Sequence, residues 1–276
     1  MSRKRFAPSS RAAAVVTGAG SGIGRSLAYE IVRRGGSVIC ADIDKARAQE
    51  TADLLNQLGS GVAIARSCDV GKEKQVAELA DAAPDLLGRP VTLVINNAGV
   101  GAGGRIGEVS LKDWRWCVQV NLWGVIHGCH FFVPQLKELG YGGIINIASA
   151  AGFAAAPEMT TYNVTKSGVL SLTETLHAEL CGTGVHVTAV CPTFVPTRIV
   201  EDSRLPESRK NFAGAAMSKW ALTDADTVAA KALNAVDRNQ LYVVPQPDGR
   251  LAWRAKRLLP ALYARGVGEV YRGFVH

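Results

Sequence analysis

The sequence AAAVVTGAGSGIG, residues 12–24, joins a short apolar run to a glycine-rich turn. Ala12 to Val16 contains only apolar residues, as expected for a strand that is buried on both faces of a parallel sheet. Thr17 to Gly24 follows at once and leads into a segment with helical periodicity that begins at Arg25. A strand, a glycine turn and a helix in this order place backbone N–H groups at a helix N-terminus, where they attract a pyrophosphate.

The turn contains Gly18, Gly20, Gly22 and Gly24, and the strict dinucleotide pattern G-x-G-x-x-G is absent; the spacing that stands in its place is Gly18, Gly22 and Gly24. Glycine is needed in such a turn because a side chain would block the approach of the phosphates. We therefore predict cofactor contacts at Gly18, Ser21, Gly22, Ile23 and Gly24. A merely structural turn is the alternative interpretation.

Short apolar runs recur along the rest of the chain, with helical segments between them. The runs are Ser37–Ala41, Gly61–Ser67, Val91–Ile95, Gly143–Ile147, His186–Cys191 and Leu241–Val244. The helical segments are Arg25–Arg34, Lys45–Leu58, Lys72–Leu87, Leu111–Leu139, Tyr162–Cys181 and Asp224–Arg238. Strands that alternate with helices predict a parallel sheet. The expected fold class is α/β, a single doubly wound, Rossmann-type parallel sheet with helices on both faces.

The chain has 276 residues, and its 47% hydrophobic content suffices for one large domain. We predict a flexible basic N-terminus over residues 1–11, a catalytic domain over 12–245 and a basic amphipathic tail over 246–276. Within the domain, residues 193–222 are longer than a strand-to-helix connection requires, which predicts a lid. The apolar residues of this lid are Phe194, Ile199, Leu205, Phe212, Met217 and Trp220.

The formal net charge of +7 is spread along the chain and is concentrated only near the two ends. No aromatic RNA-binding motif or paired Cys/His finger accompanies it, so we expect no nucleic-acid partner. The six cysteines are widely spaced without a C-x-x-C, which predicts reduced core thiols, no metal site and a cytoplasmic location. No apolar run reaches the ~20 residues of a spanning helix, and none resembles a signal-peptide core.

The tail has two different helical faces on either side of Pro260, which is predicted to kink it. One face carries Leu251, Ala255, Leu258 and Leu262, and another carries Arg250, Arg254 and Arg257. Such a basic amphipathic segment docks on its own domain or a neighbouring subunit, or lies on a membrane surface or a hydrophobic substrate. We place docking first, peripheral membrane or substrate contact second and disorder third.

Asp42 ends the second predicted strand, about twenty residues beyond the glycines. A carboxylate at this place can accept hydrogen bonds from the adenosine ribose hydroxyls and repels a 2′-phosphate. The residue therefore favours NAD as the cofactor over NADP. A simple turn-initiating role is the alternative.

Tyr162 and Lys166 stand four residues apart on a predicted helix, so their side chains project from one face. An ammonium close to a phenol stabilises the phenolate, and we expect it to lower the Tyr162 pKa below about 10. Ser149 lies just past the predicted strand Gly143–Ile147, at the edge where ligands of such sheets bind. Asn121 interrupts the predicted helix Leu111–Leu139 and predicts a local kink. Taken alone, each could be an ordinary helix or turn residue.

Together these residues resemble the short-chain dehydrogenase/reductase family across roughly residues 12–244. The motifs that carry the resemblance, in the family's order, are Thr17-Gly18-x-x-x-Gly22-x-Gly24, Asn96-Asn97-Ala98-Gly99, Asn121, Ser149 and Tyr162-x-x-x-Lys166. The resemblance implies that Tyr162 exchanges the proton and that Ser149 orients the substrate oxygen. It also implies that Lys166 holds the nicotinamide ribose and tunes Tyr162, and that Asn121 anchors a water on a proton path from Lys166.

Further cofactor contacts follow from the same resemblance. Asp69, next to Val70, is similar to the residue that contacts the adenine amino group, and strand-end caps are the alternative for it and for Asn96. Asn96 is similar to the floor of the adenosine pocket, beside Ala98 and Gly99. The matching positions in the segment against the nicotinamide carboxamide are Pro192, Val195 and Thr197. Thr193 stands where the family usually has glycine, so the backbone path at the lid hinge is left open here.

The expected reaction is hydride transfer between NAD, or NADP, and a hydrophobic secondary alcohol or ketone. Residues 150–161 and the lid are rich in Ala, Phe, Met and Trp, and no further cation next to Ser149 or Tyr162 in sequence could grip a carboxylate. The alternatives are an NADPH-dependent oxoacyl or carbonyl reductase, and a non-catalytic dinucleotide sensor or membrane-associated scaffold. The resemblance further implies a homodimer or homotetramer built on Leu111–Leu139 and Tyr162–Cys181.

Overall fold

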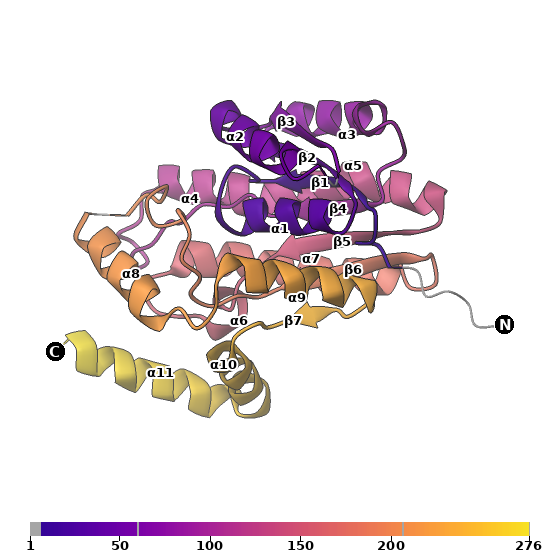
Figure 1. The fold of residues 1–276 in the computed structure, drawn as a ribbon. Coiled ribbons are helices and arrows are strands. Elements are labelled where there is room, and N and C mark those ends of the chain that lie inside the picture. The colour runs from indigo at the N-terminus through magenta and orange to yellow at the C-terminus, as the bar shows by residue number, and fades with distance from the viewer. Residues whose placement is uncertain (1–6, 60, 206, 276) are drawn as a thin grey trace.

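A computed structural model of the chain describes residues 7–59, 61–205 and 207–275. Seven parallel strands form one sheet in the order β3-β2-β1-β4-β5-β6-β7 (Figure 1). They are β1 (Ala13–Thr17), β2 (Ser37–Asp42), β3 (Ala63–Ser67), β4 (Leu93–Asn96), β5 (Gly142–Ile147), β6 (Val185–Val190) and β7 (Tyr242–Val243). The predicted doubly wound, Rossmann-type parallel sheet is confirmed.

Helices cover both faces of the sheet, as predicted. They are α1 (Gly22–Arg33), α2 (Lys45–Asn56), α3 (Glu73–Leu87), α4 (Leu111–Val118), η1 (Gln119–Trp123), α5 (Gly124–Leu139), α6 (Ala151–Ala154), α7 (Thr160–Glu179), α8 (Glu207–Trp220), α9 (Ala225–Asp237), α10 (Pro247–Leu258) and α11 (Pro260–Val275). One core packs β-strands against α1, α2 and α9, and a second packs them against α3, α5 and α7. Full burial of a side chain such as Phe132 contributes about 1.5–3 kcal/mol.

The chain reverses its direction across the sheet between β1 and β4. These two strands are hydrogen-bonded neighbours, with Val16 opposite Ile95. From β1 the chain builds outward through β2 and β3, and from β4 it builds outward the other way. The connections that leave the carboxyl ends of β1 and β4 therefore lead to opposite sides, and the crevice between them is where ligands of open α/β sheets bind.

The predicted helix Leu111–Leu139 is one run whose middle is the π-helical turn η1. Asn121 lies inside this turn and is fully buried. A π turn inserts an extra residue into the helical ladder and is frequent at functional sites. The irregularity expected at Asn121 thus takes the form of a π turn rather than a bend at a solvent-exposed asparagine.

Of the N-terminus predicted as flexible, residues 1–6 lie outside the described residues. Ser9 is fully buried against α9, and its amide and hydroxyl both donate to Asp237, at 2.8 and 2.6 Å. The six cysteines are free thiols, and all but Cys181 are buried. No helix in the described ranges is long and apolar enough to cross a membrane.

The tail forms two helices, α10 and α11, which meet at Leu259 and Pro260 where the sequence predicted a kink. α10 packs on α6, and α11 packs on α10 (Figure 1). The leucine face is not the face that docks: Leu251, Leu258 and Leu262 are 70%, 77% and 61% exposed. The body is contacted instead by Trp253, Arg257, Tyr263 and Tyr271, while Arg250 and Arg254 are exposed.

Candidate active site

A cavity of about 480 Å³ lies at the carboxyl edge of the sheet, at the crevice between β1 and β4. Segments far apart in the sequence meet there. The predicted site residues that line it are Gly18, Ser21, Gly22, Ile23, Asp42, Val70, Ala98, Gly99, Ser149, Tyr162, Lys166, Pro192, Val195 and Thr197. Gly24, Asp69, Asn96 and Asn121 are not among its lining residues.

The glycine turn has a backbone that side chains would disturb. Gly18 and Gly22 have φ values of +64° and +51°, in the left-handed region that favours glycine. A Cβ on Gly24 would lie 2.1 Å from the Gly18 carbonyl oxygen. Asn97 donates from Nδ2 to the carbonyls of Thr17 and Gly18, at 2.8 and 3.1 Å, and so holds the turn from behind.

The start of α1 leaves room for an anion. Its N-cap residue, Ser21, makes no side-chain capping bond, so the amides of the first turn are not closed off by that hydroxyl. The helix N-terminus and the side-chain-free turn together form a cradle that fits the pyrophosphate of a dinucleotide. The residues at this turn therefore fit the dinucleotide cofactor that a Rossmann-type fold implies.

The carboxylate of Asp42 lies on the far side of this turn. Its Oδ2 accepts a hydrogen bond from the Gly20 amide (2.9 Å), and its Oδ1 accepts one from the Asp44 amide (3.0 Å). The neighbouring cation is Arg47, which pairs with Asp44 at 3.1 Å and with Asp202 at 3.2 Å. This corner of the cavity thus presents three carboxylates around one arginine.

Tyr162 and Ser149 face each other across the catalytic end of the cavity. Burial raises the pKa of Tyr162 to about 12, and the hydrogen bond with Ser149 opposes that rise. The Ser149 hydroxyl also donates to the Pro192 carbonyl at 3.3 Å and accepts from the Ala151 amide at 3.1 Å. The phenol is therefore a proton donor over the whole neutral range.

The expectation that Lys166 lowers the pKa of Tyr162 is wrong for this structure. Lys166 Nζ lies 5.7 Å from the centre of the Tyr162 ring and donates to the Ile147 carbonyl at 2.8 Å. The ammonium is only 3% exposed, and burial lowers its pKa to about 8. Desolvation affects the Tyr162 pKa more than the attraction of Lys166 does, because the ammonium makes no direct hydrogen bond to the phenol oxygen.

Asn121 contributes from behind the cavity wall. Its Oδ1 accepts from the Val100 amide (2.7 Å) and its Nδ2 donates to the Val100 carbonyl (2.9 Å), so it clamps the segment that follows β4. A Cβ on Gly99 would lie 3.3 Å from Asn121 Oδ1 and 3.5 Å from Lys166 Nζ. Gly99 therefore lies next to both Asn121 and Lys166, and a larger side chain at this position would crowd both polar groups.

Two predicted cofactor residues, Asn96 and Asp69, do not line the cavity. Asn96 is 3% exposed and donates to Asn146 Oδ1 at 2.8 Å beneath the sheet edge, so it is not a floor of the cavity. Its neighbour Asn97 lines the cavity instead, because successive residues of a strand point to opposite faces. Asp69 accepts from the Gly71 amide at 3.0 Å, as a cap of the turn before α3, while Val70 lines the cavity.

The sequence reasoning missed several lining residues, among them Asn97, Val100, Trp116 and Ile199. Asn97 belongs to the quoted motif and could have been chosen from it. Trp116 carries no local signal; it is placed by Arg204, whose guanidinium lies 3.9 Å over its ring and pairs with Asp113 at 3.0 Å. Val100, Trp116 and Ile199 add apolar surface to the cavity, and Asn97 adds a polar group.

The predicted lid contains helix α8. Phe194 and Trp220 lie near the two ends of the predicted lid, residues 193–222, and their ring centres are 5.8 Å apart. Ala102, in the loop after β4, forms an isolated parallel β-bridge with Arg204, so this part of the predicted lid lies beside that loop. The side chains of Phe212 and Met217 lie outside the described residues.

Thr193, the first residue of the predicted lid, is hydrogen-bonded to the tail. Gln246, which is fully buried, accepts from the Thr193 amide at 3.1 Å, and Asp248 accepts from the Thr193 hydroxyl at 3.3 Å. Thr193 is absent from the residues with positive φ among those the structure describes, so no glycine is required here. The backbone path left open by the missing glycine is therefore fixed at Thr193 by hydrogen bonds to Gln246 and Asp248.

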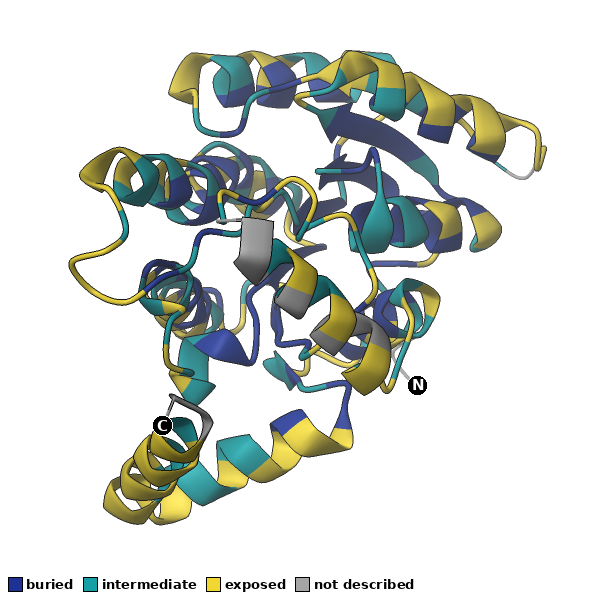
Figure 2. Ribbon diagram, turned by 90° about the vertical axis from the view of Figure 1, so that its left-hand side faces the viewer, coloured by how far each residue is buried: buried dark blue, intermediate teal, exposed yellow. Residues whose placement is uncertain are grey.

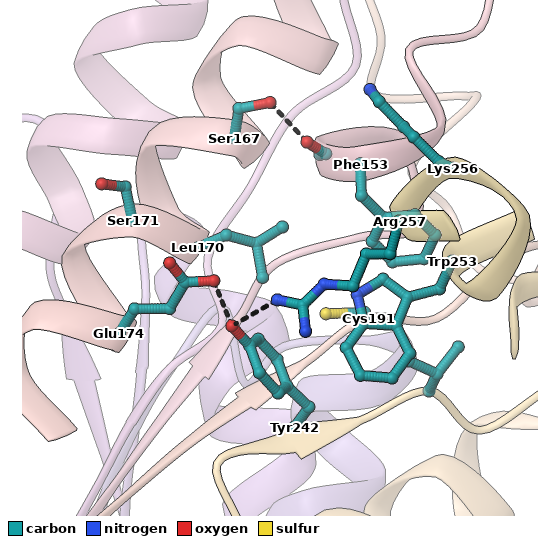
Figure 3. A pocket seen from close by; sticks show the side chains of 12 residues that line it. Phe153, Ser167, Leu170, Ser171, Glu174, Cys191, Tyr242, Trp253, Lys256 and Arg257 are labelled. Carbon is teal, nitrogen blue, oxygen red and sulfur yellow. Dashed lines mark hydrogen bonds between the residues drawn. The ribbon is translucent and has the colours of Figure 1, made fainter. Parts of the chain in front are cut away.

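A second cavity, of about 370 Å³, lies between α7, β7 and α10 (Figure 3). Tyr242 donates to Glu174, and Arg257 donates to Tyr242 at 3.5 Å while stacking 4.6 Å over Trp253. None of Ser149, Tyr162 and Lys166 lines it. This cavity lies where α10 of the tail packs on the body, and it is separate from the cavity that Ser149, Tyr162 and Lys166 line.

Comparison with known proteins agrees with this geometry. The family model "short chain dehydrogenase" matches residues 12–208. The putative oxidoreductase SadH of Mycobacterium tuberculosis is 32% identical over 256 residues, covering 91% of this chain and 92% of SadH. The probable oxidoreductase EphD of the same organism is 37% identical over 186 residues, covering 67% of this chain but only 31% of EphD, so the chain spans less than a third of that protein.

Among solved structures, a short-chain dehydrogenase/reductase from Burkholderia phymatum in complex with NAD has a TM-score of 0.81 and 35% identity, covering 90% of this chain and 94% of the other. The fold, the position of the cavity and the matched residues point to one conclusion. The chain belongs to the short-chain dehydrogenase/reductase family.

Proposed function

We propose that the chain interconverts a hydrophobic secondary alcohol and its ketone with NAD as the hydride carrier, and that Tyr162 is the general acid/base. The observation that carries the proposal is the convergence of Ser149, Tyr162 and Lys166 on the cavity that the glycine turn and Asp42 also line. The bound nicotinamide would supply or accept the hydride.

The chain's own residues account for the proton. In the reducing direction, the Tyr162 phenol donates its proton to the carbonyl oxygen as that oxygen gains negative charge. Ser149 shares a hydrogen bond with Tyr162 and can donate to the same oxygen, which orients the substrate. The Tyr162 pKa of about 12 keeps the acid form present at neutral pH, so the structure suits carbonyl reduction without further adjustment.

Alcohol oxidation needs the phenolate, and here Lys166 matters. A cation moved from the Ile147 carbonyl toward the phenol would favour the phenolate. Asn121 and Gly99 lie next to Lys166, where a water chain could return the proton to solvent. We assign Lys166 and Asn121 to holding and relaying the proton, with Lys166 also contacting the nicotinamide ribose.

The preference for NAD is supported by the charges at the ribose corner. Asp42 lines the cavity, and Arg47 is already paired with Asp44 and Asp202. A 2′-phosphate would meet these carboxylates and find no unpaired cation among the lining residues at this corner, which disfavours NADP. The similar Burkholderia phymatum protein was solved with NAD.

A hydrophobic substrate is supported by the apolar lining on the Tyr162 side. Val100, Trp116, Val195 and Ile199 line this cavity. Arg204 and Arg198 lie nearby but pair with Asp113 and Glu201, at 3.0 Å each. Paired guanidinium groups do not readily grip a substrate carboxylate, so we favour a neutral alcohol or ketone.

The test is the change in nicotinamide absorbance across a panel of hydrophobic secondary alcohols and ketones, each with NAD(H) and NADP(H). Tyr162→Phe is expected to keep nucleotide binding and to lose turnover by about 10²–10⁴-fold. Tyr29→Phe, an exposed tyrosine on α1, is the matched control and should behave as the parent protein. Retained turnover in Tyr162→Phe would refute the acid/base role.

The alternatives give different results. Faster turnover with NADP(H) on oxoacyl or carbonyl substrates would favour the reductase alternative over the NAD-linked one. Tight dinucleotide binding with no turnover on any member of the panel would favour a sensor.

A further inference from the structure

The outer face of the tail carries leucines whose side chains are largely exposed. Leu251, Leu258 and Leu262 are 61–77% exposed, and Leu259 between them is 56% exposed. Figure 2 shows most of this two-helix segment coloured as exposed. Single exposed leucines are ordinary on protein surfaces, but four within twelve residues of one segment form a continuous apolar stripe.

The inner face fixes the orientation of the stripe. Trp253 and Arg257 of α10 pack on Tyr242, with the Tyr242 and Trp253 ring centres 5.3 Å apart (Figure 3). On α11, Tyr263 donates to the Ala154 carbonyl at 3.1 Å and Tyr271 donates to Glu158 at 2.8 Å. Because these contacts hold the opposite side of both helices, the leucines are held away from the body.

The charge beside the stripe is strongly positive. Residues 247–275 contain only two acidic side chains, Asp248 and Glu269, against six basic ones: Arg250, Arg254, Lys256, Arg257, Arg265 and Arg272. Arg250 and Arg254 lie within one helical turn of Leu251 and Leu258. In the part of the chain that the structure describes, Arg250, Arg254 and Arg265 are exposed and form no ion pair with another described residue.

An anionic lipid surface fits this combination. We propose that the tail outer face, formed by Leu251, Leu258, Leu259 and Leu262 with Arg250, Arg254 and Arg265, docks the protein reversibly on a membrane that contains anionic lipid. A helix of this kind lies in the headgroup region with its leucines in the acyl boundary and its arginines among the phosphates.

A second copy of the chain fits less well. A two-fold contact through this face would set the same arginines of both copies against one another, with like charges repelling. The α10–α11 pair also lies at the outside of the molecule, beyond the helices that cover the sheet, where a flat surface can reach it (Figure 1).

The experiment is flotation of the full-length protein with vesicles of phosphatidylcholine alone or with added phosphatidylserine. We expect binding only to the anionic vesicles and release at high salt, since screening weakens the arginine contribution. Leu251→Ser with Leu258→Ser should weaken binding at least about tenfold. Leu54→Ser, an exposed leucine on α2, is the matched control and should bind as the parent protein does.

Charge reversal tests the other half of the proposal. Each basic residue near an anionic surface contributes about fivefold in affinity, so Arg250→Glu with Arg254→Glu should weaken binding at least about twentyfold. Lys74→Glu with Lys137→Glu gives the same net charge at exposed sites on α3 and α5, and should lose far less. Nucleotide binding checks that each variant is folded.

Three results would overturn the proposal. Equal binding to vesicles with and without phosphatidylserine would exclude the arginines, and full binding by the leucine variant would exclude the stripe. Sedimentation velocity supplies the third: if the leucine variant changes oligomeric state while vesicle binding is absent in every variant, the face is a contact between copies.

Discussion

Gln246→Leu tests whether the tail positions the catalytic hinge. Gln246 is fully buried, accepts from the Thr193 amide at 3.1 Å and donates to the Phe194 carbonyl at 3.4 Å. Leucine has a similar size and can make neither bond, so the substitution leaves the Thr193 N–H and the Phe194 carbonyl without these partners. The hinge is expected to loosen where it leaves β6.

The magnitude follows from the two bonds. A buried polar group without its partner costs about 1–3 kcal/mol, and the 3.4 Å bond is the weaker of the two. We expect a loss of about 2 kcal/mol in the free energy of unfolding, or roughly thirtyfold in the unfolding equilibrium. At about 2–4 °C per kcal/mol for a domain of this size, the melting temperature should fall by about 4–8 °C.

Catalysis should suffer as well. Pro192 directly precedes Thr193, and its carbonyl accepts hydrogen bonds from the Ser149 hydroxyl (3.3 Å) and the Ala150 amide (2.9 Å). A shift of this carbonyl turns Ser149 away from the substrate oxygen, for which we expect about a tenfold lower kcat.

Thermal unfolding followed by circular dichroism and steady-state kinetics on a substrate from the panel measure the two effects. Gln240→Leu is the control, because Gln240 is exposed and its bond to the Tyr242 carbonyl lies at the surface. Its stability should change by no more than about 0.5 kcal/mol. An unchanged melting temperature and kcat in Gln246→Leu would refute the coupling of the tail to the hinge.

Other perturbations test the cofactor and proton assignments. Asp42→Ala should lower the ratio of NAD to NADP turnover, and an unchanged ratio would show that the ribose contact is misplaced. Gly24→Ala should raise the nucleotide Kd at least about tenfold, since a Cβ would lie 2.1 Å from the Gly18 carbonyl oxygen; titration of dinucleotide fluorescence measures it, and parent-like binding would contradict it. Burial lowers the Lys166 pKa to about 8 from an unfolded value near 10.5, so the unfolded chain binds the extra proton between those pH values and the contribution of Lys166 to the free energy of unfolding should rise across that window. Burial also raises the pKa of five thiols, which lowers the total stability of both proteins above about pH 9. Urea unfolding should therefore show that the free energy of unfolding of the parent minus that of Lys166→Met increases over this window, and a constant difference would contradict the assignment.

Much of the fold could be predicted from local patterns. Strands β1 to β7 could be predicted from their apolar runs, and the helices between them from helical periodicity. Both patterns depend only on residues within the element itself. The turn at Gly18 to Gly24 and the pair Tyr162 and Lys166 were predictable for the same reason, since their geometry depends on residues a few positions apart.

The residues that the sequence misjudged are those whose role depends on distant contacts. Asn96 and Asn97 are adjacent, and only the pleat of β4 in the assembled sheet decides which one meets the cavity. Trp116 is placed by Arg204, which lies far away in the chain. The two faces of the tail were visible as a pattern, but which one docks depended on Glu174, Tyr242 and Ala154.

The sequence by itself determined the α/β class, the order of the elements and the residue types that make the site, because these follow from local periodicity and spacing. Only the tertiary structure decided the Tyr162 pKa of about 12, the Ile147 carbonyl as the partner of Lys166 and the hinge held by Gln246. Desolvation and long-range hydrogen bonds depend on which segments surround a group, and that is settled when the chain closes around its core.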